Sequence, residues 1–259
     1  MTSGLKIEGL SVARGGQTVL SAIDLEVPRG AWCGLIGVNG AGKTTLLRAV
    51  AGRLAQDQGA VCVEGVRLDR PRDRARHIGL SVSPERLPDV PTVARLLAEV
   101  ARAHGVPERP DHLAPLWRAL VLDELVDRPI RILSAGQKQR LGIHLAFMGA
   151  PSVVLLDEPF NALDPLIAFD LKRVLKAMAA DGLTIVTAMH DLAMMALHCS
   201  HGLLLSHGRL AEVFDAEVLA FSRRDPAAFE ASVLDRWRHA ERIGRGTPSS
   251  SSERPRRER

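Results

Sequence analysis

The sequence predicts an α/β fold that carries an antiparallel β subdomain at its N-terminal end and an inserted α-helical subdomain. The apolar runs SVVLLD (152–157) and LTIVTAM (183–189) lack polar alternation, which is typical of parallel strands buried on both faces. Helical patterns separate such runs, as in α/β cores. Residues 84–129 contain no strand pattern, which indicates a helical insertion.

The N-terminal segments alternate apolar and polar residues. Residues 5–12 and 23–27 follow this period of two and are separated by the turn-like RGGQ. Half-buried strands show this pattern. We therefore expect them to pair as a small antiparallel sheet.

The elements that follow are read from apolar spacing and from chain breakers. The buried strand AWCGLIG precedes a helix-like TTLLRAVAGRL, which ends at the breaker-rich AQDQG. Both TVARLLAEVARAHG and HLAPLWRALVLDEL have helical apolar spacing. We expect them in a helical subdomain over about residues 84–150.

Composition points to an ordinary globular chain in the cytoplasm. The 259 residues are 46% hydrophobic, no apolar run reaches the length of a membrane span, and MTSGLKIEGL lacks the layout of a signal peptide. Cys33, Cys62 and Cys199 have neither the spacing of a zinc site nor that of a disulfide framework. We expect three reduced thiols.

The net charge of +4 resides in the C-terminal segment. Residues 222–259 contain ten arginines and six acidic residues, so the rest of the chain is balanced and no nucleic-acid partner is expected. We expect this segment to be a basic, solvated extension, disordered from about residue 244. The alternative is that its arginines contact anionic lipid.

The stretch GVNGAGKT, residues 37–44, fits the G-x-x-x-x-G-K-[ST] pattern between a buried strand and a helix. Its glycines let backbone N–H groups wrap phosphates, its lysine reaches the β and γ phosphates, and its threonine hydroxyl binds Mg²⁺. Glycine-rich turns also join strands to helices without binding anything, but this context favours nucleotide binding. The expected contacts are Gly37, Val38, Asn39, Gly40, Ala41, Gly42, Lys43, Thr44 and Thr45.

Two acids end the buried strand of VVLLDEP, at the edge where α/β sheets bind ligands. Asp157 is expected to serve Mg²⁺ together with Thr44, and Glu158 to orient or deprotonate the attacking water. His190 follows another buried strand and is expected near the γ-phosphate. Alone, a histidine at a strand end is more often structural, and for acids at a strand end the structural and functional interpretations have equal weight.

The chain contains the ordered set GVNGAGKTT, LSAGQ, VVLLDEP, NALD and His190 within residues 4–213. In this order the chain resembles the nucleotide-binding subunit of ATP-binding cassette (ABC) transporters. The resemblance implies a P-loop NTPase core of the ABC type over residues 1–221, followed by the extension at 222–259. It also implies that Glu158 and His190 are catalytic.

The segment LSAGQ, residues 133–137, is called the signature segment below. The resemblance implies that its Ser134, Gly136 and Gln137 contact an ATP held by the other subunit of a dimer. It also implies that residues 161–164 cross that dimer interface. Serine is equally a preferred helix N-cap, and both roles can hold.

Three positions depart from the family pattern. Ala135 replaces the first of two glycines, and Arg14 stands where an adenine-stacking aromatic is usual. The expected glutamine after the strand at residues 78–82 is missing, and Ser83 or Glu85 takes its place. These departures leave open which nucleotide base is bound and which residues couple the nucleotide site to the membrane subunit.

The resemblance implies an ATPase that pairs as a homodimer or with a related subunit, uses ATP and Mg²⁺, and drives a separate integral membrane permease from the inner face of the cell membrane. The stretch TVARLLAEVARAHGV resembles the lobes of export-type cassettes more than those of nutrient importers, and this resemblance favours export. One alternative is a soluble ABC ATPase that acts on nucleic acid or ribosomes. Another is a regulatory subunit that binds ATP without hydrolysing it. The cargo cannot be read from this chain.

Overall fold

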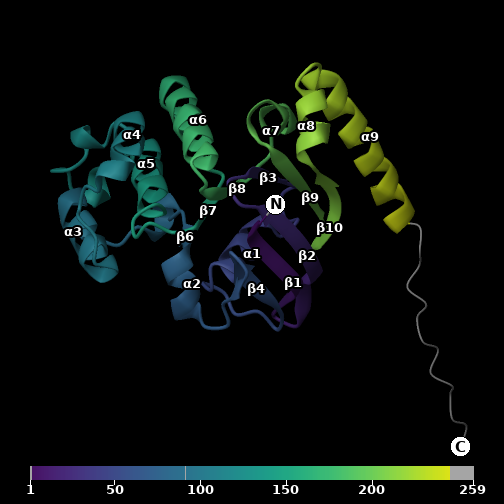
Figure 1. The fold of residues 1–259 in the computed structure, drawn as a ribbon, viewed down its shortest axis with the longest axis horizontal. Coiled ribbons are helices and arrows are strands. Elements are labelled where there is room, and N and C mark those ends of the chain that lie inside the picture. The colour runs from purple at the N-terminus through teal and green to yellow at the C-terminus, as the bar shows by residue number, and fades with distance from the viewer. Residues whose placement is uncertain (1, 91, 246–259) are drawn as a thin grey trace, which may run out of the picture.

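The computed structural model describes residues 2–90 and 92–245 (Figure 1). Within them, one sheet has the strand order β2-β1-β4-β5 and a second has the order β10-β9-β3-β8-β7-β6. The strands are β1 (Ser3–Arg14), β2 (Gln17–Pro28), β3 (Trp32–Ile36), β4 (Gln58–Val63), β5 (Val66–Arg67), β6 (Ile78–Leu80), β7 (Val153–Asp157), β8 (Thr184–Met189), β9 (His201–Ser206) and β10 (Arg209–Phe214). The predicted α/β class with an antiparallel subdomain is confirmed.

The antiparallel sheet follows from the alternation in the N-terminal segments. In β1 and β2, Leu5 lies opposite Val27 and Ile7 opposite Leu25, and all four side chains are buried. Both strands are longer than the sequence predicts, because polar residues continue the pairing out to the turn at Gly15 and Gly16.

The second sheet explains why its strands lack polar alternation. In β7, Val154 and Leu156 belong to one hydrophobic core, whereas Val153 and Leu155 belong to another. The two cores lie on opposite faces of the sheet, because successive side chains of a strand point to opposite sides. Both faces are therefore covered, and each residue of β7 before Asp157 is apolar.

The parallel register brings three strand ends to one edge of this sheet. Ile36 at the end of β3 lies opposite Met189 at the end of β8, and Asp157 at the end of β7 lies opposite Ala188. The residues that directly follow these strands are therefore neighbours in space. The core helices α1 (Lys43–Val50), α2 (Pro71–His77), α6 (Pro165–Ala180) and α7 (Leu192–His198) connect the strands.

The inserted segment forms a helical lobe beside the sheets (Figure 1). It contains α3 (Val93–His104), α4 (Ala114–Ala119), α5 (Ala135–Leu145) and the short 3₁₀ helices η1 (Pro84–Arg86), η2 (Asp111–Leu113), η3 (Leu122–Glu124) and η4 (Ile130–Ile132). The continuous helical spacing of HLAPLWRALVLDEL is misleading, because the chain is broken there into η2, α4 and η3. The break lies at Val121, whose φ of 48° is left-handed.

The C-terminal segment differs from the expected solvated extension. After α8 (Ala216–Ser222), the helix α9 (Pro226–Arg245) packs on the body: Val233 is fully buried and Phe229 makes an edge contact with Phe214. The expectation of solvation is therefore wrong for this part of the segment. The disorder predicted from about residue 244 falls largely on residues 246–259, which lie outside the described residues, and the domain boundary at 221 stays a prediction.

Two further expectations concern the membrane and the thiols. No helix among the described residues is both long and apolar enough to cross a bilayer. Cys33, Cys62 and Cys199 are free thiols, as expected. Burial raises the pKa of Cys33 to about 12, so this thiol packs rather than reacts.

Candidate nucleotide site

The loop at residues 37–42 leads from β3 into the N-terminal end of α1. Gly40 and Gly42 have φ values of 83° and 105°, which glycine adopts at little cost. Gly42 is the N-cap of α1 and provides no side-chain cap, and no acidic residue lies in the first turn. The first N–H groups of α1 therefore have no intrahelical partner and suit an anion such as a phosphate.

The ammonium group of Lys43 is buried inside this loop. Its side chain is only 6% exposed, and its Nζ donates to the carbonyl oxygen of Gly37 at 2.7 Å. The same Nζ lies 3.4 Å from His190 Nδ1 and 4.0 Å from Glu158 Oε1. Burial lowers the pKa of Lys43, although the neighbouring carboxylates oppose this. A buried cation at this point attracts a phosphate strongly.

Thr44 and Asp157 form the pair predicted to bind the metal. The Thr44 hydroxyl donates to Asp157 Oδ1 at 3.1 Å, and the Asp157 N–H donates to Ser81 Oγ at 2.9 Å. Burial raises the pKa of Asp157, so the buried carboxylate lacks full charge compensation. A hydroxyl and a carboxylate are hard oxygen ligands, and these residues therefore fit Mg²⁺.

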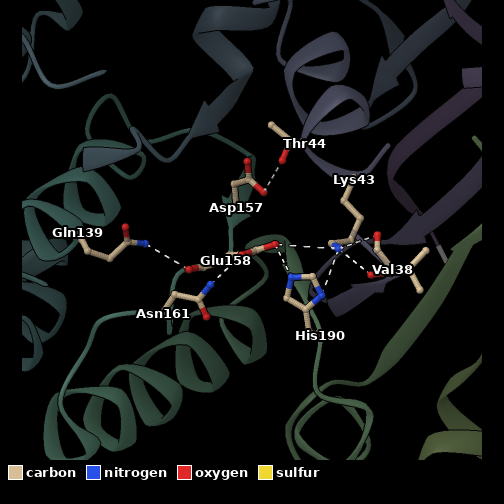
Figure 2. Close-up of polar contacts among 9 residues, drawn as sticks. Val38, Lys43, Thr44, Gln139, Asp157, Glu158, Asn161 and His190 are labelled. Carbon is tan, nitrogen blue, oxygen red and sulfur yellow. Dashed lines mark hydrogen bonds and ion pairs between the residues drawn. The ribbon is translucent and has the colours of Figure 1, made fainter. Parts of the chain in front are cut away.

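Glu158 and His190 lie next to each other, and both are close to the Lys43 ammonium (Figure 2). His190 Nε2 lies 2.6 Å from Glu158 Oε1, and Asn161 Nδ2 donates to Glu158 Oε2 at 2.7 Å. Because lysine only donates and the carboxylate only accepts, these contacts assign the His190 proton to Nε2. Glu158 has a φ of 48°, a left-handed conformation that costs a non-glycine residue roughly 1–3 kcal/mol.

The signature segment makes its hydrogen bonds locally. Ser134 Oγ accepts from the Gln137 N–H at 3.2 Å, and Gln137 Oε1 accepts from the Ser134 N–H at 3.0 Å. This capping box begins α5 and confirms the N-cap interpretation of Ser134. No hydrogen bond among the described residues joins Ser134 or Gln137 to the loop at residues 37–45. Gly136 packs on another segment, because a Cβ there would overlap the Ala162 carbonyl oxygen.

The structure thus brings Lys43, Thr44, Asp157, Glu158 and His190 together, and among the described residues the side chains of Ser134 and Gln137 form no hydrogen bond with them. Ser83 precedes η1 and Glu85 lies within it, and neither side chain forms a hydrogen bond or ion pair to these site residues. Sequence reasoning missed the polar contacts of Ser81, and those of Gln139, whose Nε2 donates to the Glu158 carbonyl at 3.3 Å. A serine at a strand end and a glutamine inside a helix carry too weak a pattern to find them.

Comparisons with known proteins agree with this geometry. A family model described as ABC transporter matches residues 20–161. The lantibiotic transport ATP-binding protein SrtF of Streptococcus pyogenes is 32% identical over 189 residues, which cover 73% of this chain and 81% of SrtF. The hemin import ATP-binding protein HmuV of Pseudomonas aeruginosa is 36% identical over 220 residues, which cover 79% of this chain and 84% of HmuV.

Solved structures show the same architecture. An ATP-binding subunit of an ABC transporter superposes with a TM-score of 0.74 at 30% identity, covering 85% of this chain and 92% of that chain. The protein cbiO1 from Clostridium perfringens, part of the ABC transporter complex cbiONQ, superposes with a TM-score of 0.72 at 25% identity, and the match covers 93% of this chain and 100% of that chain. The chain therefore belongs to the ABC transporter family and is one of its ATP-binding subunits, an ATPase.

Proposed function

We propose that this ATPase binds ATP with Mg²⁺, completes its site by pairing with a second cassette, and uses hydrolysis to drive a separate membrane permease. The observation that carries the proposal is the cluster in which Lys43, Asp157, Glu158 and His190 surround one loop. The signature segment of the same chain does not contribute to that cluster. A second cassette, either another copy or a related subunit, supplies the missing side.

The loop binds and orients the triphosphate. Backbone N–H groups of residues 37–45 and the Lys43 ammonium face its phosphates, which explains why the loop needs glycine at positions with positive φ. Thr44 and Asp157 would hold Mg²⁺, which when bound neutralises charge on the β and γ phosphates. The adenine contact is assigned to Arg14, whose guanidinium can stack on a base.

Glu158 and His190 serve the chemical step. A water attacks the γ-phosphorus, Glu158 accepts a proton from this water, and the bond from phosphorus to the bridging oxygen breaks with its electron pair left on ADP. Asn161 and His190 each hold one carboxylate oxygen of Glu158. These contacts keep the carboxylate turned towards the loop.

The signature segment is proposed to serve the partner's ATP. Ser134 is exposed at the start of α5, and no acidic residue lies in the first turn of that helix. The helix end therefore carries partial positive charge that suits a phosphate. Ser134 and Gln137 exchange their internal contacts for contacts with the γ-phosphate, and Gly136 lets it approach the backbone.

The partners follow from this role. A separate integral membrane permease would place the subunit at the inner face of the cell membrane. Relatives include a lantibiotic transport protein, a hemin import protein and a methionine import protein, so they span more than one kind of transport. Export, which rests on the helical stretch from residue 92, stays a prediction. An action on nucleic acid or ribosomes is not favoured, because these relatives are transport proteins.

The variant Glu158→Gln tests the assignment. We expect kcat to fall about 10²–10⁴-fold while ATP binding persists, since the variant keeps the shape of the side chain and removes the base. Size-exclusion chromatography with ATP and Mg²⁺ should then show a stable dimer. Glu99→Gln on α3, an exposed pair with Arg95, is the matched control and should behave as the parent. Turnover of Glu158→Gln at the parent rate would refute the proposed base.

A second measurement separates transport from nucleic-acid binding. Affinity purification from membranes should recover an integral membrane protein with this chain. Binding to nucleic acid that weakens steeply with salt, without a membrane partner, would instead support the alternative.

A further inference from the structure

Gln139 connects α5 to the turn that carries Glu158. It lies on α5 with only 7% of its surface exposed, and its Nε2 donates to the main-chain carbonyl oxygen of Glu158 at 3.3 Å (Figure 2). Buried polar groups in native proteins almost always have a hydrogen-bond partner, and the Glu158 carbonyl is the partner of the Gln139 amide. Its position therefore ties the orientation of the Glu158 peptide to α5.

The turn at residues 158–162, called the acid turn below, depends on such support. Glu158 and Ala162 both have positive φ, at 48° and 62°, which non-glycine residues keep only when their surroundings enforce it. Within the turn, the Asn161 N–H donates to the Glu158 carbonyl at 3.2 Å, and from outside it the Glu158 N–H donates to the Ala188 carbonyl at 3.1 Å.

The helix α5 contacts the acid turn at both ends. Gly136 lies directly against the Ala162 carbonyl oxygen, and Gln139, three positions later, reaches the Glu158 carbonyl. Residues three apart lie on one face of a helix, so a single face of α5 holds the whole turn. The N-terminal end of that same helix begins at Ser134.

We propose that Gln139 is a positioning residue for Glu158. Glu158 acts on the nucleotide bound by its own chain, and the first turn of α5 contacts the nucleotide bound by the partner. Through Gln139, the orientation of the Glu158 carboxylate therefore depends on α5. Loss of the amide donor frees the Glu158 peptide to rotate out of its left-handed conformation, which turns the carboxylate away from His190. This inference rests on the proposed role of Glu158 as the base.

The variant Gln139→Met removes the donor and nearly keeps the volume. We expect kcat to fall about 10–10²-fold with an unchanged KM for ATP, because a misplaced group slows the chemical step without weakening binding. In the nucleotide-free protein, the Asn161 amide should exchange its hydrogen faster, because its acceptor is the released carbonyl. Should this variant not fold, Gln139→Leu, which is uncharged and likewise has no donor, gives the same test.

Gln56→Met is the matched control. Gln56 Nε2 donates to the Gly59 carbonyl at 2.7 Å, the same kind of contact far from the acid turn, so this variant should keep the parent kcat. A parent-like kcat in Gln139→Met would overturn the proposal.

A double variant separates positioning from a general structural effect. In a Glu158→Gln background no base remains to be positioned, so adding Gln139→Met should change the residual turnover by less than about twofold. A further tenfold loss would contradict the inference while leaving the proposed function intact. Parent-like turnover of Glu158→Gln alone would instead refute the function of the site.

Discussion

The two regions expected to contact ATP differ in how far they are assembled. Around the loop at residues 37–45, Lys43, Thr44, Asp157, Glu158 and His190 already contact one another. In the signature segment, the side chains of Ser134 and Gln137 each accept a hydrogen bond from the other's backbone N–H, and no other side-chain hydrogen bond of these two is found among the described residues. A single chain assembles the first region. In the second, Ser134 and Gln137 cap a helix, and we expect them to contact a phosphate only when the partner's ATP is bound.

The difference follows from the elements that carry each region. The first region collects residues from the ends of three parallel strands, whose register forces them together. The second lies at the start of a helix in the inserted lobe, where local bonds satisfy it. Variants of the first should therefore change nucleotide binding by the isolated chain, whereas variants of the second should change turnover only when subunits are paired.

After Glu158→Gln, the largest effect is expected from Lys43→Ala. Loss of the buried ammonium should lower kcat/KM by about 10²–10³-fold, as the removal of one preorganised charge-stabilising group does. ATP binding should weaken as well, and titration calorimetry measures that part. Lys176→Ala, an exposed lysine on α6, serves as control. A Lys43→Ala protein that binds ATP normally would show that this region does not need its assembled charge.

The next largest effect is expected on the acid stability of the fold, through His144, a buried histidine on α5. Burial lowers the pKa of His144 to about 4, and Trp117 packs edge-on against the ring at 5.3 Å. The pKa of His144 is lower in the folded chain than in the unfolded chain. The neutral ring therefore contributes its full share to the free energy of unfolding above pH 6.5, and this contribution is lost as the pH falls towards 4. The loss amounts to about 3 kcal/mol over that window.

Denaturant unfolding at several pH values measures this. His144→Leu cannot titrate, so its free energy of unfolding should fall less between pH 6.5 and 4 than that of the parent. His77→Gln, at an exposed position on α2, should retain the parental slope. Equal slopes in His144→Leu and the parent would assign the acid sensitivity to other groups.

Ser134 can be changed so that its two roles separate. Asparagine and aspartate cap helices as well as serine does, so Ser134→Asn and Ser134→Asp should keep the melting temperature, whereas Ser134→Ala should lose about 1 kcal/mol. Aspartate alone adds a charge that repels a phosphate, which should cut the turnover of paired subunits by roughly tenfold, on the order of 1.4 kcal/mol. Full turnover in Ser134→Asp would mean that the segment is only a cap.

The smallest effect is expected from Asp157→Asn in the nucleotide-free protein. Burial raises the pKa of Asp157, so the charged carboxylate costs stability at neutral pH and this cost disappears as the pH falls below its ordinary pKa. The variant should therefore melt slightly higher than the parent at pH 7 and equally at pH 3. With ATP and Mg²⁺ the parent should gain more, and a variant that gains as much would contradict the metal assignment.

Much of the first region could be predicted from the sequence. Apolar runs without alternation predict parallel strands, and parallel strands bring Asp157, Glu158 and His190 to one edge. The break at Val121 and the docking of α9 could not be predicted, because tertiary packing decides them. The contact of Gln139 could not be predicted either, because its partner is a backbone carbonyl, which every residue type provides.

The left-handed backbone at Glu158 has a consequence for engineering this protein. Glycine and asparagine tolerate that conformation better than glutamate does. A selection for heat resistance that ignored turnover would thus favour exchanging the very side chain on which hydrolysis is proposed to depend. Directed evolution of hardier variants should hold this codon fixed and search elsewhere.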